Sequence, residues 1–325
     1  MGRHVAGDMP GLDRLVEDSC AAIGREIDAL RVPRLAGVVL GGGYGRGEGG
    51  VIEECRIGNV KCKIEDAECR LSNDLDFFAI TEVGVPEAET LAAIGAALKP
   101  ISEKWTAKLG VDVDFAVKTP WRLKHDEERI MVQELLRGYF DVAGKKGEAL
   151  FSGIEKIDAA KLPWMEAARL LMNRGMGILF AMSGTRSREF VNRNINKCVL
   201  GAGDARLVAR HGYAWRAEER DKARGDALYS AAVEWKFRPR EEPVCDLEAA
   251  REIWMAAFAE VSGDSGSSRR SFRNAARWLV RRRSIGELRT FALDPVVRVL
   301  ESVARCVRER RAPGGSLMRD WEIFN

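Results

Sequence analysis

The chain has few of the residues on which the commonest enzyme sites depend. It contains 3 histidines and 7 cysteines among 325 residues. His4, His125 and His211 are isolated from one another, so none has the spacing of a metal-binding motif. The Gly-x-Ser-x-Gly pattern of serine hydrolases is absent, and no Lys-Ser/Thr follows the glycine-rich segment as a P-loop requires. The sequence therefore gives no support to histidine-metal, serine-hydrolase or P-loop chemistry.

Long apolar runs and a strong charge imbalance are also missing. No apolar segment approaches the roughly 18 residues of a membrane span, and the N-terminal residues lack the basic-then-apolar pattern of a signal peptide. The net charge of +3 is too close to zero to indicate wholesale nucleic-acid binding. The cysteines are odd in number and scattered, unlike a disulfide scaffold. We therefore expect a cytoplasmic, reduced protein without a membrane partner.

The length is sufficient for two domains, and a composition of 46% apolar and 31% charged residues is ordinary for a globular protein. Three short apolar segments are typical of buried strands: Arg34–Leu40, Leu75–Ile80 and Val111–Val117. Apolar residues at helical spacing predict helices over residues 11–31 and 86–109. The N-terminal domain, residues 1–145, is therefore predicted to be mixed α/β.

Residues 51–72 interrupt this domain and are interpreted as an insertion. The segments on either side of Gly58-Asn59 predict a two-stranded hairpin in which Cys55 lies opposite Cys62. These cysteines could form a metal clip with Cys69, although no histidine is near and the spacing differs from that of zinc motifs. Plain packing of the hairpin is the alternative.

Strand patterns fade after about residue 145, and helical periodicity replaces them. Residues 146–325 are therefore predicted to form an all-helical second domain. Its candidate helices cover residues 163–182, 194–210, 215–236, 245–262, 268–283 and 294–311.

Two pairs of aspartates occupy alternate positions in the second and third predicted strands. Asp74 and Asp76 share one face of their strand, and Asp112 and Asp114 share one face of theirs. Like charges so placed repel each other, and a cation is the usual compensation. Mg²⁺ binds through one or two carboxylates with waters and phosphates, and two such ions promote phosphoryl-type displacement. The pairs therefore predict a two-metal site, with a solvated strand face as the alternative.

A glycine-rich segment, Leu40–Gly50, follows the first predicted strand. Within it, Gly45-x-Gly47-x-x-Gly50 formally matches the dinucleotide-binding fingerprint, but a hairpin pattern follows where a helix and a parallel strand are required. A plain structural turn is a further alternative. Arg46 favours an anion, because guanidinium groups pair well with phosphate.

Together these segments resemble the DNA polymerase β-like nucleotidyltransferase superfamily, in particular its minimal and antibiotic-type members, over residues 35–118. The superfamily pattern is a Gly-Ser-x-x-Arg-Gly turn, then Ser-Asp-x-Asp, then a hydrophobic-Asp-hydrophobic strand. Its counterparts here are Gly42–Glu48, Asn73–Asp76 and Val111–Val113. Two departures are a glycine, Gly43, in place of the serine, and the long insertion before the paired acids. The resemblance implies an α+β fold: a nucleotidyltransferase-like mixed sheet with flanking helices, followed by the helical domain.

The resemblance also implies a reaction, in which an acceptor hydroxyl attacks the α-phosphorus of an NTP and pyrophosphate leaves. Asp74 and Asp76 would hold two Mg²⁺ ions, and Asp112 would complete the catalytic metal site. Asp114 shares the face of Asp112, so it is the alternative third carboxylate, and either of these two would accept the proton of the hydroxyl.

The nucleotide is expected to be ATP. By the resemblance, the backbone amides of Gly42 and Gly43 would hold its triphosphate, with Arg46 as a further phosphate ligand. Lys197 lies in a segment similar to the helix that supplies a lysine to the triphosphate in such enzymes. A solvated surface lysine is the alternative for this residue.

The acceptor is not identified by the sequence; a small molecule is favoured over a protein or an RNA end. Residues 268–283 place arginines on one helical face, which is either a solvated basic face or a contact for an anionic acceptor such as RNA. Two other functions compete with nucleotidyl transfer. One is a nucleotide-binding or sensing module without catalysis, favoured by the missing serine. The other is a dinucleotide-dependent oxidoreductase, from the glycine pattern.

Overall fold

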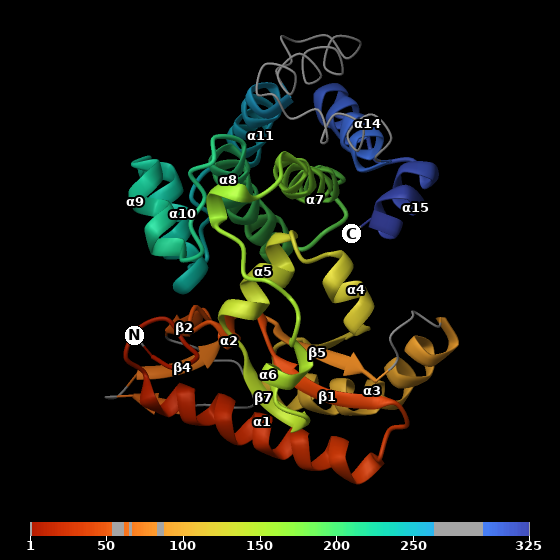
Figure 1. The fold of residues 1–325 in the computed structure, drawn as a ribbon. Coiled ribbons are helices and arrows are strands. Elements are labelled where there is room, and N and C mark those ends of the chain that lie inside the picture. Colours follow the sequence, from red (N-terminus) through yellow and green to blue (C-terminus); the bar gives the residue numbers. More distant parts are fainter. Residues whose placement is uncertain (1, 54–61, 65–66, 83–87, 263–294, 325) are drawn as a thin grey trace. The chain divides into compact units, whose positions relative to one another are not determined.

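A computed structural model of the protein describes residues 2–53, 62–64, 67–82, 88–262 and 295–324 (Figure 1). The chain is mixed α/β, with a small mixed sheet and many helices. It forms two compact units. Unit 1 comprises Met1–Ile157 with Phe237–Pro239, and unit 2 comprises Asp158–Lys236 with Arg240–Asn325. The expected domain boundary at residue 145 lies inside unit 1.

Unit 1 contains all the strands of the described chain, divided between two sheets. Its elements are α1 (Pro10–Leu30), β1 (Leu35–Leu40), α2 (Gly42–Gly45), β2 (Val51–Glu53), β3 (Cys62–Ile64), β4 (Ala67–Leu71), β5 (Leu75–Thr81), α3 (Ala88–Leu109), β6 (Val113–Lys118), α4 (Pro120–His125), α5 (Ile130–Arg137), β7 (Phe140–Gly144) and α6 (Gly147–Leu150).

The main sheet has the strand order β6-β5-β1-β7, in which β5 and β6 are parallel while β1 is antiparallel to both its neighbours. The continuous apolar run of β1 agrees with its central position, because both its faces are buried. The strands expected at residues 34–40, 75–80 and 111–117 are confirmed as β1, β5 and β6. The edge strand β7 was not predicted from the sequence.

Helices cover both faces of the main sheet (Figure 1). Leu75, Phe77 and Ala79 of β5 pack into a core with α1 and α3, whereas Phe78 and Ile80 pack into a second core with α4 and α5. The alternation follows from the period of two in a strand. The expected apolar stripe of α3 is confirmed, and Pro100 lies inside that helix.

The insertion folds into a separate three-stranded sheet of order β2-β4-β3. The predicted pairing of the segments on either side of Gly58-Asn59 is wrong, because β4 lies between β2 and β3 and pairs with both. Cys62 is therefore in register with Cys69, and Cys55 lies outside the described residues. A central β4 forms backbone hydrogen bonds along both edges, which a single hairpin cannot provide.

Unit 2 is helical throughout its described residues, as expected for the second domain. Its elements are the 3₁₀ turn Ala159–Lys161, α7 (Trp164–Met182), α8 (Arg188–Ala209), α9 (Ala217–Arg224), α10 (Ala227–Phe237), α11 (Leu247–Ser262), α14 (Pro295–Glu309) and α15 (Gly315–Phe324).

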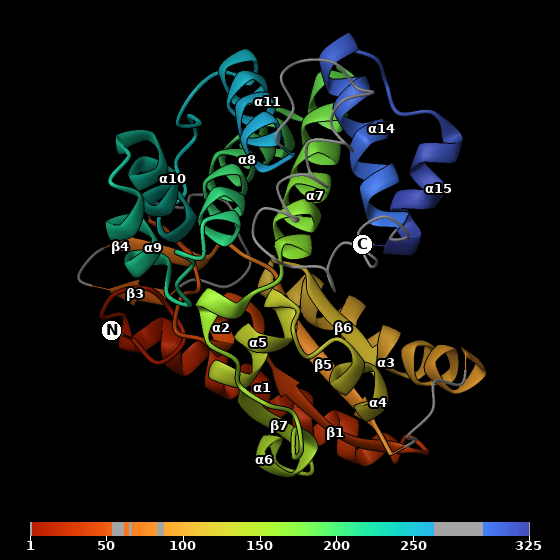
Figure 2. The same ribbon diagram turned by 45° about the horizontal axis from the view of Figure 1, so that its top comes forward.

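The core of unit 2 forms where α7 packs against α8, α11 and α14 (Figure 2). Trp254 of α11 is fully buried, and its indole N–H donates to the Leu171 carbonyl of α7 at 2.9 Å. Gly175 permits this approach, because a Cβ there would lie 2.7 Å from the Trp254 ring.

Most of the expected helices of unit 2 are confirmed, with one correction. The expected helix 215–236 is two helices, α9 and α10, because the chain turns at Gly225, which has φ +57°. Helix α15 was not predicted, and the arginine-striped segment 268–283 lies outside the described residues.

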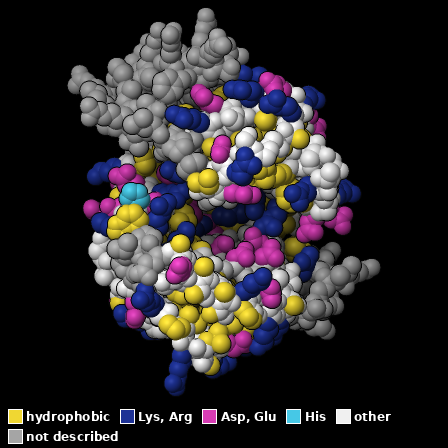
Figure 3. Space-filling view, turned by 90° about the vertical axis from the view of Figure 1, so that its right-hand side faces the viewer, with side chains coloured by type: hydrophobic (Ala, Val, Ile, Leu, Met, Phe, Trp, Pro, Cys, Tyr) yellow, Lys and Arg dark blue, Asp and Glu magenta, His cyan; other side chains and the backbone are white. Residues whose placement is uncertain are grey.

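No helix within the described ranges has the length and apolar character needed to cross a membrane. On the face drawn in Figure 3, Lys and Arg side chains are interspersed with Asp and Glu side chains.

Candidate functional site

The four aspartates of interest lie at the same end of two neighbouring parallel strands, β5 and β6. Asp76 and Asp114 are direct partners in the β5–β6 register. Asp74 and Asp112 each precede their strand by one residue, and the Leu75 N–H donates to the Asp112 carbonyl at 2.8 Å. Neighbouring strands lie about 4.8 Å apart, so the paired positions are close. The structure thus brings together the two acid pairs that the sequence predicted to converge.

The side chains of Asp76 and Asp114 belong to the sheet face that α4 and α5 cover further along, since they alternate with residues of the opposite core. Asp76, Asp112 and Asp114 are exposed, and Asp74 is half-buried. Burial raises the pKa of Asp114, and the negative charges of Asp112 and Asp74 raise this pKa further. These carboxylates therefore act on one another electrostatically, and a cation would relieve their repulsion.

The glycine turn lies against this acidic end of the sheet. The Gly41 N–H donates to the Asp76 carbonyl at 2.8 Å. Gly42 has φ +60°, and a Cβ built there would lie 2.2 Å from Asp76 Oδ2. Only glycine satisfies both conditions, the left-handed backbone and the close approach of a carboxylate. The first residue of α2 is thereby placed directly beside Asp76.

Gly43 is the position at which the superfamily pattern has serine. A Cβ at Gly43 would lie 3.2 Å from the Glu48 carbonyl oxygen, which is a tight contact. The Glu48 N–H donates to the Gly43 carbonyl at 2.8 Å, so these two residues close the turn on each other. The absence of a side chain at position 43 therefore agrees with the local packing.

Tyr44 is a structural residue of this site that the sequence analysis did not select. It is fully buried, and its hydroxyl donates to the Gly50 carbonyl at 2.8 Å. The same oxygen accepts the N–H groups of Ser72 at 3.1 Å and Asn73 at 3.3 Å. Tyr44 thus ties the glycine turn to the segment that leads into Asp74. A lone tyrosine inside a glycine-rich stretch is the sequence signal that could have identified it.

Replacing Tyr44 with Phe is expected to lower the free energy of unfolding by about 1–3 kcal/mol, because buried backbone groups lose their partner. Urea denaturation measures the change. Tyr139→Phe is the matched control, since the Tyr139 hydroxyl has no hydrogen-bond partner among the described residues. Equal stability of the two variants would contradict the role assigned to the Tyr44 hydroxyl.

Arg46, expected to bind phosphate, lies in an ion-pair network. Its guanidinium contacts Glu134 of α5 at 2.8 Å and Glu48 at 3.4 Å, and all three side chains are at least four-fifths buried. Gly138 packs closely on it, since a Cβ there would lie 2.5 Å from Arg46 Cγ. This geometry fastens the turn to α5. A contact between Arg46 and a phosphate stays a prediction that would require the network to open.

Lys197 lies on α8 of unit 2, where it is half-buried. Its contact with a triphosphate stays a prediction.

The dinucleotide-binding fingerprint lacks its structural context in the described chain. That fingerprint requires a strand, a helix and a second strand parallel to the first. Here both neighbours of β1 run antiparallel to it, and the next strand, β2, belongs to the other sheet.

A metal site can be tested against these side chains. Among the described residues, no group of three or more His, Cys, Asp or Glu side chains is arranged to hold a metal ion by itself. Mg²⁺ does not need such a group, because it binds through one or two carboxylates and completes its shell with waters and substrate phosphates. The adjacent positions of Asp76 and Asp114, and the mutual repulsion at Asp114, fit that requirement.

Comparison of the chain with protein families, with curated proteins and with solved structures found no match. No relative therefore indicates a function, and the side chains of the site are the guide to its chemistry.

Proposed function

We propose that the protein is a nucleotidyltransferase with a fold of the DNA polymerase β-like type, which transfers a nucleoside monophosphate from an NTP to an acceptor hydroxyl. The observation that carries the proposal is the in-register pair Asp76–Asp114 beside the glycine turn at Gly42. Carboxylates of this kind can hold a metal ion, and the backbone N–H groups of a turn without side chains can bind phosphate oxygens. The combination is suited to a metal-bound triphosphate.

Asp74, Asp76 and one of Asp112 and Asp114 would hold two Mg²⁺ ions. When bound, Mg²⁺ neutralises the developing charge on the phosphate oxygens and lowers the pKa of the attacking hydroxyl. Backbone amides of Gly42 and Gly43 would orient the triphosphate. Asp114, the register partner of Asp76, or its neighbour Asp112 would accept the hydroxyl proton.

ATP is the proposed donor, and a small molecule with a hydroxyl group is the proposed acceptor. A catalytically inactive nucleotide-binding module is the second candidate. One observation favours it: residue 43 lacks the hydroxyl group of the superfamily pattern.

The two functions differ in whether pyrophosphate is released. With saturating ATP and Mg²⁺ we expect a rise in thermal stability, equivalent to about 2.7 kcal/mol at one hundred times the dissociation constant. Adding a small-molecule cell extract should then release pyrophosphate and label an extract component from [α-³²P]ATP. Thermal protection by ATP, with no pyrophosphate released even after protein and RNA fractions are added as acceptors, would support the binding module. Absence of both effects, or protection by NAD in place of ATP, would contradict both candidates.

A further inference from the structure

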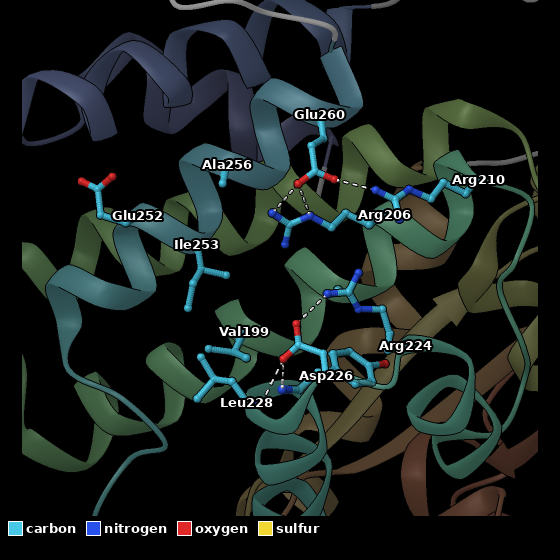
Figure 4. A pocket seen from close by; sticks show the side chains of 12 residues that line it. Val199, Arg206, Arg210, Arg224, Asp226, Leu228, Glu252, Ile253, Ala256 and Glu260 are labelled. Atoms are coloured by element: carbon cyan, nitrogen blue, oxygen red, sulfur yellow. Dashed lines mark hydrogen bonds and ion pairs between the residues drawn. The ribbon is translucent and has the colours of Figure 1, made fainter.

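Unit 2 contains a cavity that the proposed reaction does not use. Its volume is about 520 Å³, within the usual range for small-molecule sites. The cavity lies among α8, α10 and α11 (Figure 4). It is lined on one part by the apolar side chains of Val199, Leu228 and Ile253, and on another by arginines.

Two of the arginines come from the C-terminal end of α8 and share one carboxylate. Arg206 contacts Glu260 Oε1 through Nε at 3.0 Å and through a terminal nitrogen at 2.9 Å. Arg210 contacts Glu260 Oε2 at 3.0 Å. The Arg206 side chain is only 12% exposed, whereas Arg210 is 65% exposed and marks the rim. The single carboxylate of Glu260 therefore neutralises only one of these two guanidinium charges.

The third arginine, Arg224, ends α9 and reaches the cavity from another side (Figure 4). One terminal nitrogen contacts Asp226 Oδ2 at 2.9 Å, and the side chain is 15% exposed. Its Nε is buried and has no hydrogen-bond partner within the described part of the chain. Only one terminal nitrogen of this guanidinium is occupied by a carboxylate, so its other terminal N–H groups remain for a ligand.

The carboxylates around the cavity do not balance these arginines. Asp226 also accepts the N–H groups of Leu228 and Tyr229 at the start of α10, so hydrogen bonds already occupy both its oxygens. Glu252 forms an ion pair with Arg251, which does not line the cavity. Three arginines therefore face two carboxylates, Asp226 and Glu260, which leaves one excess positive charge at a partly buried position.

We propose that this cavity binds a small organic oxyanion, a phosphate ester or a carboxylate, whose apolar body packs on Val199, Leu228 and Ile253. Arg206 and Arg224 bind the oxyanion, because each guanidinium is held in place on one edge by a carboxylate and has further N–H donors for a ligand. All residues that line the cavity belong to unit 2, and the proposal does not depend on the proposed reaction.

Isothermal titration of the full-length protein without Mg²⁺ tests the site. The probes are phenyl phosphate, benzoate, inorganic phosphate and the neutral benzyl alcohol. Phenyl phosphate or benzoate should bind with one site per chain and at least about tenfold more tightly than inorganic phosphate and benzyl alcohol, a difference of about 1.4 kcal/mol. The stronger of the two identifies the preferred oxyanion.

Two variants locate the binding. Arg224→Gln removes the charge, and Ala256→Phe fills the cavity from an exposed wall position without removing any arginine. Each should weaken the tighter probe by at least about tenfold. The matched controls are Arg188→Gln, which breaks an exposed ion pair of α8 with Glu242, and Ala92→Phe at an exposed position of α3.

The controls should bind within about twofold of the original protein, since a tenfold change corresponds to about 1.4 kcal/mol and neither control touches the cavity. Absence of binding by every probe would overturn the proposal. Unchanged binding in a folded Ala256→Phe variant would also overturn it, because the probe would then lie elsewhere. Equal binding of inorganic phosphate and phenyl phosphate would overturn the assignment of the apolar wall.

Discussion

Replacing Asp76 with Asn is expected to reduce pyrophosphate release by about a thousandfold or more, with the fold unchanged. Asp76 is the carboxylate beside the glycine turn and the register partner of Asp114. If it holds Mg²⁺ at the transferred phosphate, its loss removes several kcal/mol of charge stabilisation, and about 4 kcal/mol corresponds to a thousandfold in rate. The measurement is the initial rate of pyrophosphate release at saturating ATP, with a circular dichroism melt of the same sample.

Asp18→Asn is the matched control, because it removes an exposed carboxylate of α1, a helix that contributes none of the four aspartates. This variant should retain the full rate. A folded Asp76→Asn protein with undiminished pyrophosphate release would contradict the proposed function. Loss of rate in both variants would instead indicate a general effect of charge.

The same assay, repeated over a range of Mg²⁺ concentrations, decides between Asp112 and Asp114 as the third carboxylate. Replacing the metal-holding residue should raise the Mg²⁺ concentration that activity requires, whereas replacing a residue that only accepts the proton should lower the rate at every Mg²⁺ concentration.

Asp114→Asn carries a second expectation, for stability. Because the pKa of Asp114 is raised, the folded state binds its proton more tightly than the unfolded state, so the stability it contributes at low pH is lost as pH rises through that pKa. At neutral pH and without metal, Asp114→Asn should therefore be slightly more stable than the original protein. This advantage should disappear below about pH 4, the ordinary range of aspartate pKa values.

Replacing Gly42 with Ala is expected to lower the free energy of unfolding by about 1–3 kcal/mol and to abolish most of the activity. The new methyl group meets two obstacles: the backbone has φ +60°, and the Cβ position is 2.2 Å from Asp76 Oδ2. The Asp76 carboxylate must move to admit the methyl group, so the loss of activity has a geometric cause. Urea denaturation and the pyrophosphate assay measure the two effects.

Gly110→Ala separates backbone strain from this contact. Gly110 has φ +71° but no atom within 4 Å of its Cβ position, so this variant should show strain alone and keep its activity. A double-mutant cycle gives the second check: in an Asp76→Ala background, Gly42→Ala should cost less than it does alone. Equal costs in the two backgrounds would show that the contact between position 42 and Asp76 does not form.

Much of the architecture could be predicted because its signals are local. The apolar runs of β1, β5 and β6 and the helical stripes of α7 and α11 are visible within single segments, and the structure confirms those elements. The alternate spacing of Asp74 with Asp76, and of Asp112 with Asp114, predicted one strand face for each pair. The structure places Asp76 and Asp114 within β5 and β6, and Asp74 and Asp112 one residue before those strands. The sequence by itself therefore determined which segments form these strands and helices, which of their faces are buried, and where the aspartates lie along them.

Only the tertiary structure decided how remote segments pair. Strand β4 separates β2 from β3, the edge strand β7 joins β1, and Arg46 forms its ion pairs with Glu48 and Glu134. The same holds for Tyr44, whose hydroxyl accepts hydrogen bonds from residues 28 and 29 positions later in the chain, Ser72 and Asn73. Which distant segments pair depends on the relative free energies of the alternative pairings. The spacing of apolar residues within one segment contains no information about those free energies. For the same reason, the partnership of Asp76 with Asp114 could be established only once β5 and β6 were seen side by side.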